Sequence, residues 1–360
     1  MTETQHPVAP ASAQPARSGS SLAAWLIGLC LALGVAIIAA VAVGAVALSF
    51  TTVSSVVWHK LTGLGAVTWT PVEAQIVWEF RMPRVLLAAI VGAALSVAGT
   101  VLQAMVRNPL ADPYIFGISS GASVGAVAVL TLGAAVVGGA SLPLSAFIGA
   151  LGTMLSVYAL ASKDGRASPI RLILAGVAVS YMLSAITSFL VLRASTPSGG
   201  GVSSVLYWLA GSLGGAKWEL LGVPALALVI STALLMLRAR PLNALLVGDE
   251  SAASLGVNLE RFRLELFVVT SLLVGVAVAV SGAIGFVGLM IPHVTRMLIG
   301  SDHRRVLPIA ALLRATYLVL VDLLGRTIIA PVELPVGLVT AALGGPVFLW
   351  LMRRQARGLA

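Results

Sequence analysis

Long runs of apolar residues, separated by short polar turns, make up most of this chain. Several runs reach the ~20 residues that a helix needs to cross a bilayer. They lie at 22–49, 81–106, 114–137, 142–161, 171–192 and about 217–238. A polar segment, 239–262, follows before apolar sequence resumes at Leu264. The runs lack the alternation of a barrel strand, so the pattern predicts an all-α, polytopic membrane protein.

In the last third, basic residues decide the predicted topology. The pair Arg261 and Arg263, the group 302–305 and the pair Arg353 and Arg354 are all expected in the cytoplasm. All three reach it only if a short extra crossing occupies 286–300, after a turn at 282–285. The chain then has about ten transmembrane helices with both termini cytoplasmic, and most of its 22 Lys and Arg residues lie on that side.

Composition supports this class. Hydrophobic residues make up 59% of the 360 residues, charged residues only 10%, and the mean hydropathy is +1.03. The net charge of +9 is spread over the ends of apolar segments, so it indicates membrane anchoring and no nucleic-acid partner. The single cysteine, Cys30, excludes an intrachain disulfide.

The sequence predicts one membrane domain with short tails. Residues 1–20, rich in Ala, Pro, Ser and Gln, are expected to form a disordered cytoplasmic tail. The apolar run after them is longer than a signal-peptide core, so we expect it to be the first crossing. The permease domain would span 21–354, including a cytoplasmic segment at 241–263, and 355–360 would form the C-terminal tail.

Four pairs of residues repeat at one offset along the chain: Gly92 and Gly275, Gly99 and Gly282, Pro109 and Pro292, and Gly117 and Gly300. Inverted repeats are common in transporters. The offset predicts that the second to fifth helices run opposite to the seventh to tenth.

A set of motifs occurs in order between about 70 and 354. It comprises Arg81-Met-Pro-Arg84, Gly99-x-x-x-Gln103, Asn108-Pro-Leu-Ala-Asp-Pro113, Gly117-Ile-Ser-Ser-Gly121, Tyr207-Trp-Leu-Ala-Gly-Ser212, Leu255-Gly256, Gly285-Phe-Val-Gly-Leu-Met-Ile-Pro-His293, Asp322-x-x-x-Arg326, Glu333-Leu-Pro-Val-Gly337 and Gly345-Pro-Val-Phe348. In this combination the chain resembles the FecCD family of ABC importer permeases, transmembrane subunits of type II importers that carry iron-siderophores, haem and cobalamin.

The resemblance implies a set of partners. Two permease copies, as a homodimer, would work with two cytoplasmic ATPase subunits and a periplasmic binding protein in the bacterial inner membrane. The chain has no G-x-x-x-x-G-K-[ST] phosphate loop, so ATP and Mg²⁺ would bind the separate ATPase and this chain would be a transport subunit, not an enzyme.

Several positions acquire expected roles from the resemblance. Arg81, Arg84 and Arg326 would dock acidic residues of the binding protein, with simple interfacial anchoring as the alternative. Asn108, Pro109 and Leu110 would form a cytoplasmic gate, although an ordinary helix–helix turn fits the same residues.

The polar segment between the sixth and seventh crossings carries the predicted contact with the ATPase. Its residues are Gly248, Asp249, Glu250, Ser251, Ala252, Ala253, Ser254, Leu255 and Gly256. Asp249 and Glu250 favour a helix start, and Gly256 a helix end. The resemblance implies a coupling helix, and a solvated loop helix is the alternative.

Other polar residues are placed near the pathway. Tyr207, Trp208 and Gln103 are assigned to the periplasmic gate or pathway, although the two aromatics also fit an interfacial belt. Asp322 and Arg326, four residues apart, are expected to pair and to leave Arg326 partly available. Arg314, where the family usually has a small residue, is expected to snorkel inward or to line the pathway.

Catalytic and metal sites are not predicted. The segment Gly117–Gly121 matches G-x-S-x-G, but it begins an apolar helix and has no His and acid partners, so an intramembrane hydrolase using Ser119 or Ser120 is disfavoured. His59, His293 and His303 lack metal-ligand spacing. An ion-coupled carrier normally has several carboxylates in its crossings, whereas Asp322 is the main candidate here, so this class is disfavoured.

We therefore expect an ATP-driven importer that works by alternating access. Its cargo is expected to be an iron-bearing chelate, haem or ferric siderophore, with cobalamin as the alternative.

Overall fold

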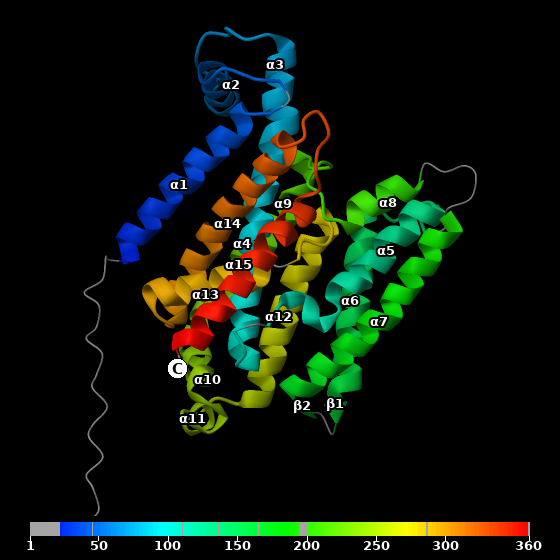
Figure 1. Cartoon of the computed structure of the whole chain (residues 1–360), viewed down its shortest axis with the longest axis vertical. Coiled ribbons are helices and arrows are strands. Elements are labelled where there is room, and N and C mark those ends of the chain that lie inside the picture. Colours follow the sequence, from blue (N-terminus) through cyan, green and yellow to red (C-terminus); the bar gives the residue numbers. More distant parts are fainter. Residues whose placement is uncertain are drawn as a thin grey trace, which may run out of the picture.

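The computed structural model describes residues 22–44, 46–109, 111–135, 137–163, 166–194, 201–285 and 287–358 as a bundle of helices (Figure 1). The first half contains α1 (Leu22–Ala42), α2 (Phe50–Thr62), α3 (Pro71–Gln75), the π-helical η1 (Ile76–Arg81), α4 (Met82–Val106), the 3-10 helix η2 (Pro113–Phe116), α5 (Ile118–Leu132), α6 (Leu142–Ala161) and α7 (Pro169–Ala194). The second half contains α8 (Gly201–Leu209), the 3-10 helix η3 (Trp218–Leu220), α9 (Gly222–Leu237), α10 (Ala239–Val247), α11 (Asp249–Ser254), α12 (Leu259–Ser281), α13 (Val287–Ile299), α14 (His303–Thr327) and α15 (Val336–Gly358). Strands β1 (Ser162–Lys163) and β2 (Arg166–Ala167) form an antiparallel pair between α6 and α7.

Within these residues, seven helices are long and apolar enough to cross a membrane. They are α1, the continuous helix 71–106, α6, α7, 218–237, α12 and α14, and α5 and the first part of α15 are shorter apolar helices. The prediction of an all-α polytopic membrane protein is confirmed. The predicted extra crossing at 286–300 contains the short helix α13, and its passage across the membrane stays a prediction.

Two predicted boundaries are wrong near the N-terminus. The first crossing ends at Ala42, because Ser49 begins a separate helix, α2, by accepting a hydrogen bond from the Thr52 amide. The second crossing begins ten residues before Arg81 at Pro71, where Thr70 and Glu73 form a capping box. Both starts are signalled locally, by Ser49 and by Thr70-Pro71.

Helix α4 forms the centre of the bundle and is buried along nearly its whole length. It packs against α12, α13 and α14 (Figure 1). Gly92 permits a close approach to α14, because a Cβ atom there would lie 2.8 Å from the Arg314 carbonyl oxygen. The apolar core therefore surrounds a helix that carries two predicted site motifs, one at each end.

The two halves of the bundle have matching contacts. Exchanging α4 for α12, α5 for α13, α6 for α14 and α7 for α15 converts the α4–α14 contact into α12–α6, and the α5–α6 contact into α13–α14. Gly275 on α12 meets Ala150 of α6, as Gly92 on α4 meets α14. Helices α4 and α12 also run in opposite directions (Figure 1). This arrangement agrees with the predicted inversion of the second to fifth helices relative to the seventh to tenth. The constant offset of the residue pairs is not kept, because Gly99 lies inside α4 whereas Gly282 follows α12, and Gly117 directly precedes α5 whereas Gly300 follows α13.

The segment resembling a hydrolase motif lies in a tightly packed helix pair. A Cβ atom on Gly121 of α5 would lie 2.3 Å from the Gly149 carbonyl oxygen on α6, and one on Gly125 would lie 2.0 Å from the Ser145 carbonyl oxygen. Gly121 of this motif, like Gly125 one turn later, therefore serves close helix packing.

The predicted N-terminal tail lies outside the described residues, as does Leu110. Helix α15 continues to Gly358, so most of the predicted C-terminal tail is helical. We refer below to the end of the bundle that carries α2 and α3 as the α2 end, and to the opposite end as the α11 end (Figure 1).

Candidate functional site

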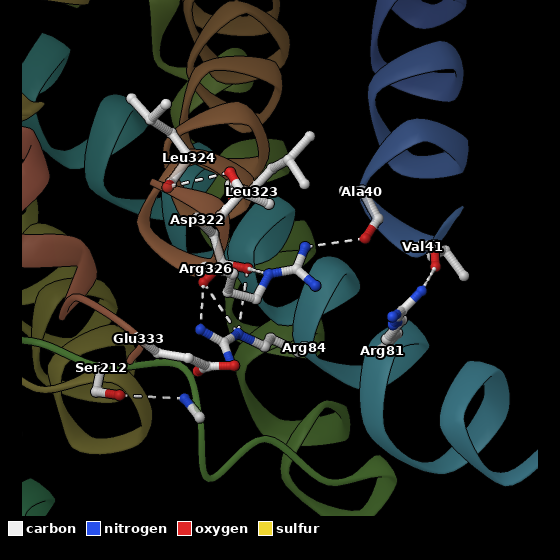
Figure 2. Close-up of polar contacts among 12 residues, drawn as sticks. Ala40, Val41, Arg81, Arg84, Ser212, Asp322, Leu323, Leu324, Arg326 and Glu333 are labelled. Carbon is white, nitrogen blue, oxygen red and sulfur yellow. Dashed lines mark hydrogen bonds and ion pairs between the residues drawn. The ribbon is translucent and has the colours of Figure 1, made fainter. Parts of the chain in front are cut away.

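At the α2 end, Arg84 is held by two acids (Figure 2). Its Nε lies 3.0 Å from Asp322 Oδ1 and 3.2 Å from Asp322 Oδ2, and its Nη1 lies 2.6 Å from Glu333 Oε2. Asp322 is on α14 and Glu333 is in the connection from α14 to α15. Through these contacts the Arg84 guanidinium joins α4 to α14 and to the α14–α15 connection, more than two hundred residues away in the sequence.

Arg326 completes the same network. Its Nε lies 3.0 Å from Asp322 Oδ2, and its Nη2 donates to the Ala40 carbonyl oxygen of α1 at 2.9 Å (Figure 2). The predicted Asp322–Arg326 pair is therefore present. The expectation that Arg326 is partly available is wrong, because its side chain is only 5% exposed.

Arg81 has a different set of partners. Its Nη1 donates to the Val41 and Ala42 carbonyl oxygens at 2.7 and 2.8 Å, and its Nη2 donates to the Val46 carbonyl oxygen. These carbonyls end α1 and begin the connection to α2, so Arg81 acts as a side-chain cap for that helix end. A Cβ atom on Gly44 would lie 2.6 Å from Arg81 Nη2, so a side chain there would displace the guanidinium.

The three predicted docking arginines thus share one end of the bundle, and all are nearly buried. Two of them, Arg84 and Arg326, share Asp322, and two carboxylates balance their two charges. Glu333, which sequence analysis assigned no partner, is the exposed member, with 49% of its side chain accessible. The only sequence signal for Glu333 is the motif Glu333-Leu-Pro-Val-Gly337, because no helical spacing links Glu333 to Arg84.

Three motifs meet where α8, α12 and α15 approach one another at the same end. The Gly337 amide donates to the Gly211 carbonyl oxygen at 3.2 Å, and the Ser212 amide donates to the Ser281 carbonyl oxygen at 2.9 Å. A Cβ atom on Gly282 would lie 2.2 Å from the Trp208 carbonyl oxygen. Trp208 is thereby held against this junction, whereas Tyr207 is exposed.

At the α11 end, α4 stops abruptly. Arg107 has left-handed backbone angles, φ 53° and ψ 36°, and the Asn108 amide donates back to the Gln103 carbonyl oxygen at 3.1 Å. This is the hydrogen bond of a Schellman ending, with arginine in the position that glycine usually takes. Asn108 and Pro109 follow it on the exposed surface.

The chain after this ending folds back toward the second repeat. Asp112 Oδ1 accepts a hydrogen bond from the Tyr114 amide and begins η2. The Tyr114 hydroxyl accepts from the Ile284 amide at 2.9 Å, in the turn between α12 and α13. The non-helical segment at the predicted gate is therefore tied to the corresponding turn of the other half.

The predicted coupling helix forms as α11. It begins at Asp249 after Gly248, whose φ is 137°, and Gly256 follows it with φ 82°. Asp249 accepts hydrogen bonds from Arg263 Nη2 on α12 at 2.8 Å to both oxygens, and Arg107 Nη2 lies 3.6 Å from Oδ1. The hydrogen bonds from Arg263 hold the pKa of Asp249 below its ordinary value against the opposing effect of burial, and the charges of Arg263 and Arg107 lower it further.

A second connection joins α10 to the start of α14. Asn243 Nδ2 donates to Asp302 Oδ1 at 2.7 Å, while Asn243 Oδ1 accepts from the His303 amide at 2.9 Å. Asp302 also caps α14. Both helices of the polar segment are therefore fastened to the transmembrane core.

Two further predicted residues are buried. Gln103 accepts a hydrogen bond from Arg296 of α13 and lies one turn from the α11 end of α4. Arg314 is fully buried, and its guanidinium has no hydrogen-bond partner within the described residues, so the expectation that it snorkels or lines the pathway is wrong. Its electrostatic neighbours are Asp112, Tyr114 and Tyr317.

Relatives with named cargo cover most of this chain. The hemin transport system permease HmuU of Yersinia pestis is 43% identical over 87% of this chain and 90% of its own length. The cobalamin import permease BtuC of Halobacterium salinarum is 45% identical over 80% of this chain and 77% of its own length.

A solved structure has the same fold. An inward-facing transporter assigned to the metal-chelate type of ABC transporters superposes with a TM-score of 0.79 at 32% identity, covering 91% of this chain and 98% of that one. The model of the FecCD transport family matches residues 22–354, nearly the whole described bundle. This chain belongs to the FecCD transport family and is an ABC importer permease.

Proposed function

We propose that this permease moves a large iron-bearing chelate, haem or a ferric siderophore, from the periplasm to the cytoplasm by alternating access. The hemin permease aligns with more of this chain than the cobalamin permease does, although the latter is slightly more identical. Cobalamin import is therefore the second candidate.

The observation that carries this proposal is the meeting of the predicted gate and the predicted coupling helix at the α11 end. Arg107, directly before Asn108 and Pro109, lies beside Asp249 at the start of α11. The basic residues near this end, Arg238, Arg240, Arg261 and Arg263, favour a cytoplasmic location. In this orientation α11 faces an ATPase, and the α2 end faces the periplasm of a bacterial inner membrane.

The partners follow from the same orientation. A second copy of this chain would complete the pathway, two ATPase subunits would bind ATP and Mg²⁺ and contact α11, and a periplasmic binding protein would dock at the α2 end. Tyr207 and Trp208 would lie near the periplasmic mouth, and Gln103 deeper toward the gate. Acidic residues of the binding protein would reach Arg84 by competing with the exposed Glu333, whereas Arg81 would support docking by holding the end of α1.

Uptake in a strain that lacks this gene tests the proposal. The strain would be supplied separately with haem, ferric siderophores and cobalamin, with and without the complementing gene. We expect uptake of one iron chelate to return with the gene and to be lost with a hydrolysis-deficient ATPase. Restored uptake that does not depend on ATP hydrolysis by the ATPase would indicate a secondary carrier. If the gene restores uptake of cobalamin and of no iron chelate, the second candidate is established.

A further inference from the structure

Asp249 holds two cations that belong to different parts of the bundle. Arg263 on α12 contacts both of its oxygens at 2.8 Å, with a side chain only 14% exposed. Arg107 at the end of α4 lies 3.6 Å from one of the same oxygens and is about half exposed. The carboxylate thus has a short, sheltered contact with the core and a longer, more open contact with the end of the gate helix.

The backbone of Arg107 brings its side chain to this carboxylate. Left-handed angles are costly for residues other than glycine, so the conformation persists only where surrounding contacts support it. A Cβ atom on Gly248 would lie 3.7 Å from Arg107 Nη1, so the guanidinium also lies over the junction between α10 and α11. The end of α4 is therefore in contact with the first turn of α11 through one side chain.

The unequal contacts suit a component that moves. A surface pair at 3.6 Å contributes little to stability and exchanges readily, whereas the sheltered contact in which Arg263 Nη2 donates to both Asp249 oxygens at 2.8 Å holds its geometry better. A rotation of α11 about the Asp249–Arg263 contact changes the distance from Asp249 to Arg107 without breaking that contact. The next residues after Arg107 are Asn108 and Pro109, so such a change acts directly on the predicted gate.

We propose that Asp249 is the positioning residue that transmits movement of α11 to the Arg107–Pro109 end of α4. The inference rests on the proposed function, in which an ATPase contacts α11. It assigns the transmission of this movement to the Asp249 carboxylate, which contacts Arg107 of α4 and Arg263 of α12. This contact acts in addition to any general movement of the helices.

Hydrogen exchange in the purified permease–ATPase complex provides a test that does not depend on the cargo. Exchange of residues 104–112 would be compared between the nucleotide-free complex and the complex trapped with ATP and vanadate. In the wild type we expect nucleotide to change exchange in 104–112 and in 249–256. In Asp249→Asn we expect the change in 249–256 to remain and the change in 104–112 to be lost, while Asp249→Glu restores it.

Glu265→Gln is the matched control, because it removes a 2.8 Å contact near the same end, between Arg238 Nε and Glu265 Oε1, in which neither residue belongs to α4 or α11. It should respond to nucleotide as the wild type does. The inference is overturned if Asp249→Asn keeps the nucleotide response in 104–112, or if the wild type shows a response in 249–256 and none in 104–112. Loss of the response in both segments of Asp249→Asn would also overturn it, by placing Asp249 in ATPase contact rather than in transmission.

Uptake and ATP hydrolysis in proteoliposomes then separate this inference from the proposed function. We expect Asp249→Asn to lower uptake per ATP by about tenfold, a typical coupling effect, with hydrolysis retained. A wild-type complex that hydrolyses ATP but imports no chelate would refute the cargo assignment, and the exchange result would still decide the role of Asp249.

Discussion

Arg84 and Asp322 form a two-point contact across the bundle, with Arg84 Nε and Nη2 both 3.0 Å from Asp322 Oδ1. The two residues are 238 positions apart and join the centre of the first repeat to the second. Arg326 lies on the other oxygen of the same carboxylate. One buried acid therefore compensates two arginines, and its removal leaves both without their shared partner.

Asp322→Asn should destabilise the protein by roughly 3–5 kcal/mol, because it leaves buried cations uncompensated. Glu333→Gln, which removes the half-exposed partner of Arg84, should cost about 1 kcal/mol or less. Thermal unfolding in detergent compares the two. Equal melting temperatures for the two variants would contradict the assignment of Asp322 as the central residue of this network.

Arg314→Met should raise the melting temperature. The variant removes three guanidinium nitrogens that have no hydrogen-bond partner in the described structure, and it keeps a long apolar side chain. Burying one unpaired ion costs several kcal/mol in lost hydration, and methionine avoids that cost. Arg326→Met is the comparison. It should be destabilising, because Asp322 and the Ala40 carbonyl oxygen lose their contacts with Arg326. A lower melting temperature for Arg314→Met would indicate that Asp112, Tyr114 or Tyr317 needs this charge.

Gly92→Ala should destabilise the protein by roughly 1–3 kcal/mol, because its methyl group would lie 2.8 Å from a backbone oxygen of α14 and force the two central helices apart. Gly152→Ala on α6 is a suitable control, since a Cβ atom there meets nothing within 4 Å and alanine favours helix. Unfolding measurements should place the variants on opposite sides of the wild type or show Gly152→Ala as neutral. No loss of stability in Gly92→Ala would show that the α4–α14 contact can adjust.

Arg81→Ala should loosen the connection between α1 and α2. Three carbonyl oxygens lose their donor, each worth about 0.5–1.5 kcal/mol. Hydrogen exchange near residues 43–52 should rise, while exchange in α14 remains as in the wild type. Unchanged exchange near α1 would mean that other contacts hold this end, and that Arg81 is available for another partner.

The contact between Asp249 and Arg263 should depend on pH. The pKa of Asp249 is lowered in the folded protein, chiefly by the Arg263 hydrogen bonds. Its contribution is therefore complete above the ordinary pKa of an aspartate and is lost as the pH falls through the lowered value. After correction for the intrinsic slowing of amide exchange in acid, the protection of 249–256 should fall over that acidic interval in the wild type and not in Asp249→Asn. The same acid response in both would assign it to another group.

Local sequence signals were sufficient for the membrane class and for much of the helix pattern. Apolar length predicted the crossings, because a bilayer requires each backbone group to be bonded within its helix. Asp249, Glu250 and Gly256 marked the limits of α11 through the helix dipole and a left-handed stop. The spacing of four positions from Asp322 to Arg326 predicted their pair, since both lie on one helix face.

Only the tertiary structure decided which partners the other charged residues have. Arg81 and Arg84 are three positions apart, yet Arg81 bonds the end of α1 and Arg84 bonds α14 and the segment before α15. Arg314 carries no local sign that it is buried without a hydrogen-bond partner. Crossing length and helix limits are local properties of the backbone and its solvent, whereas these contacts depend on how helices far apart in the sequence cross one another.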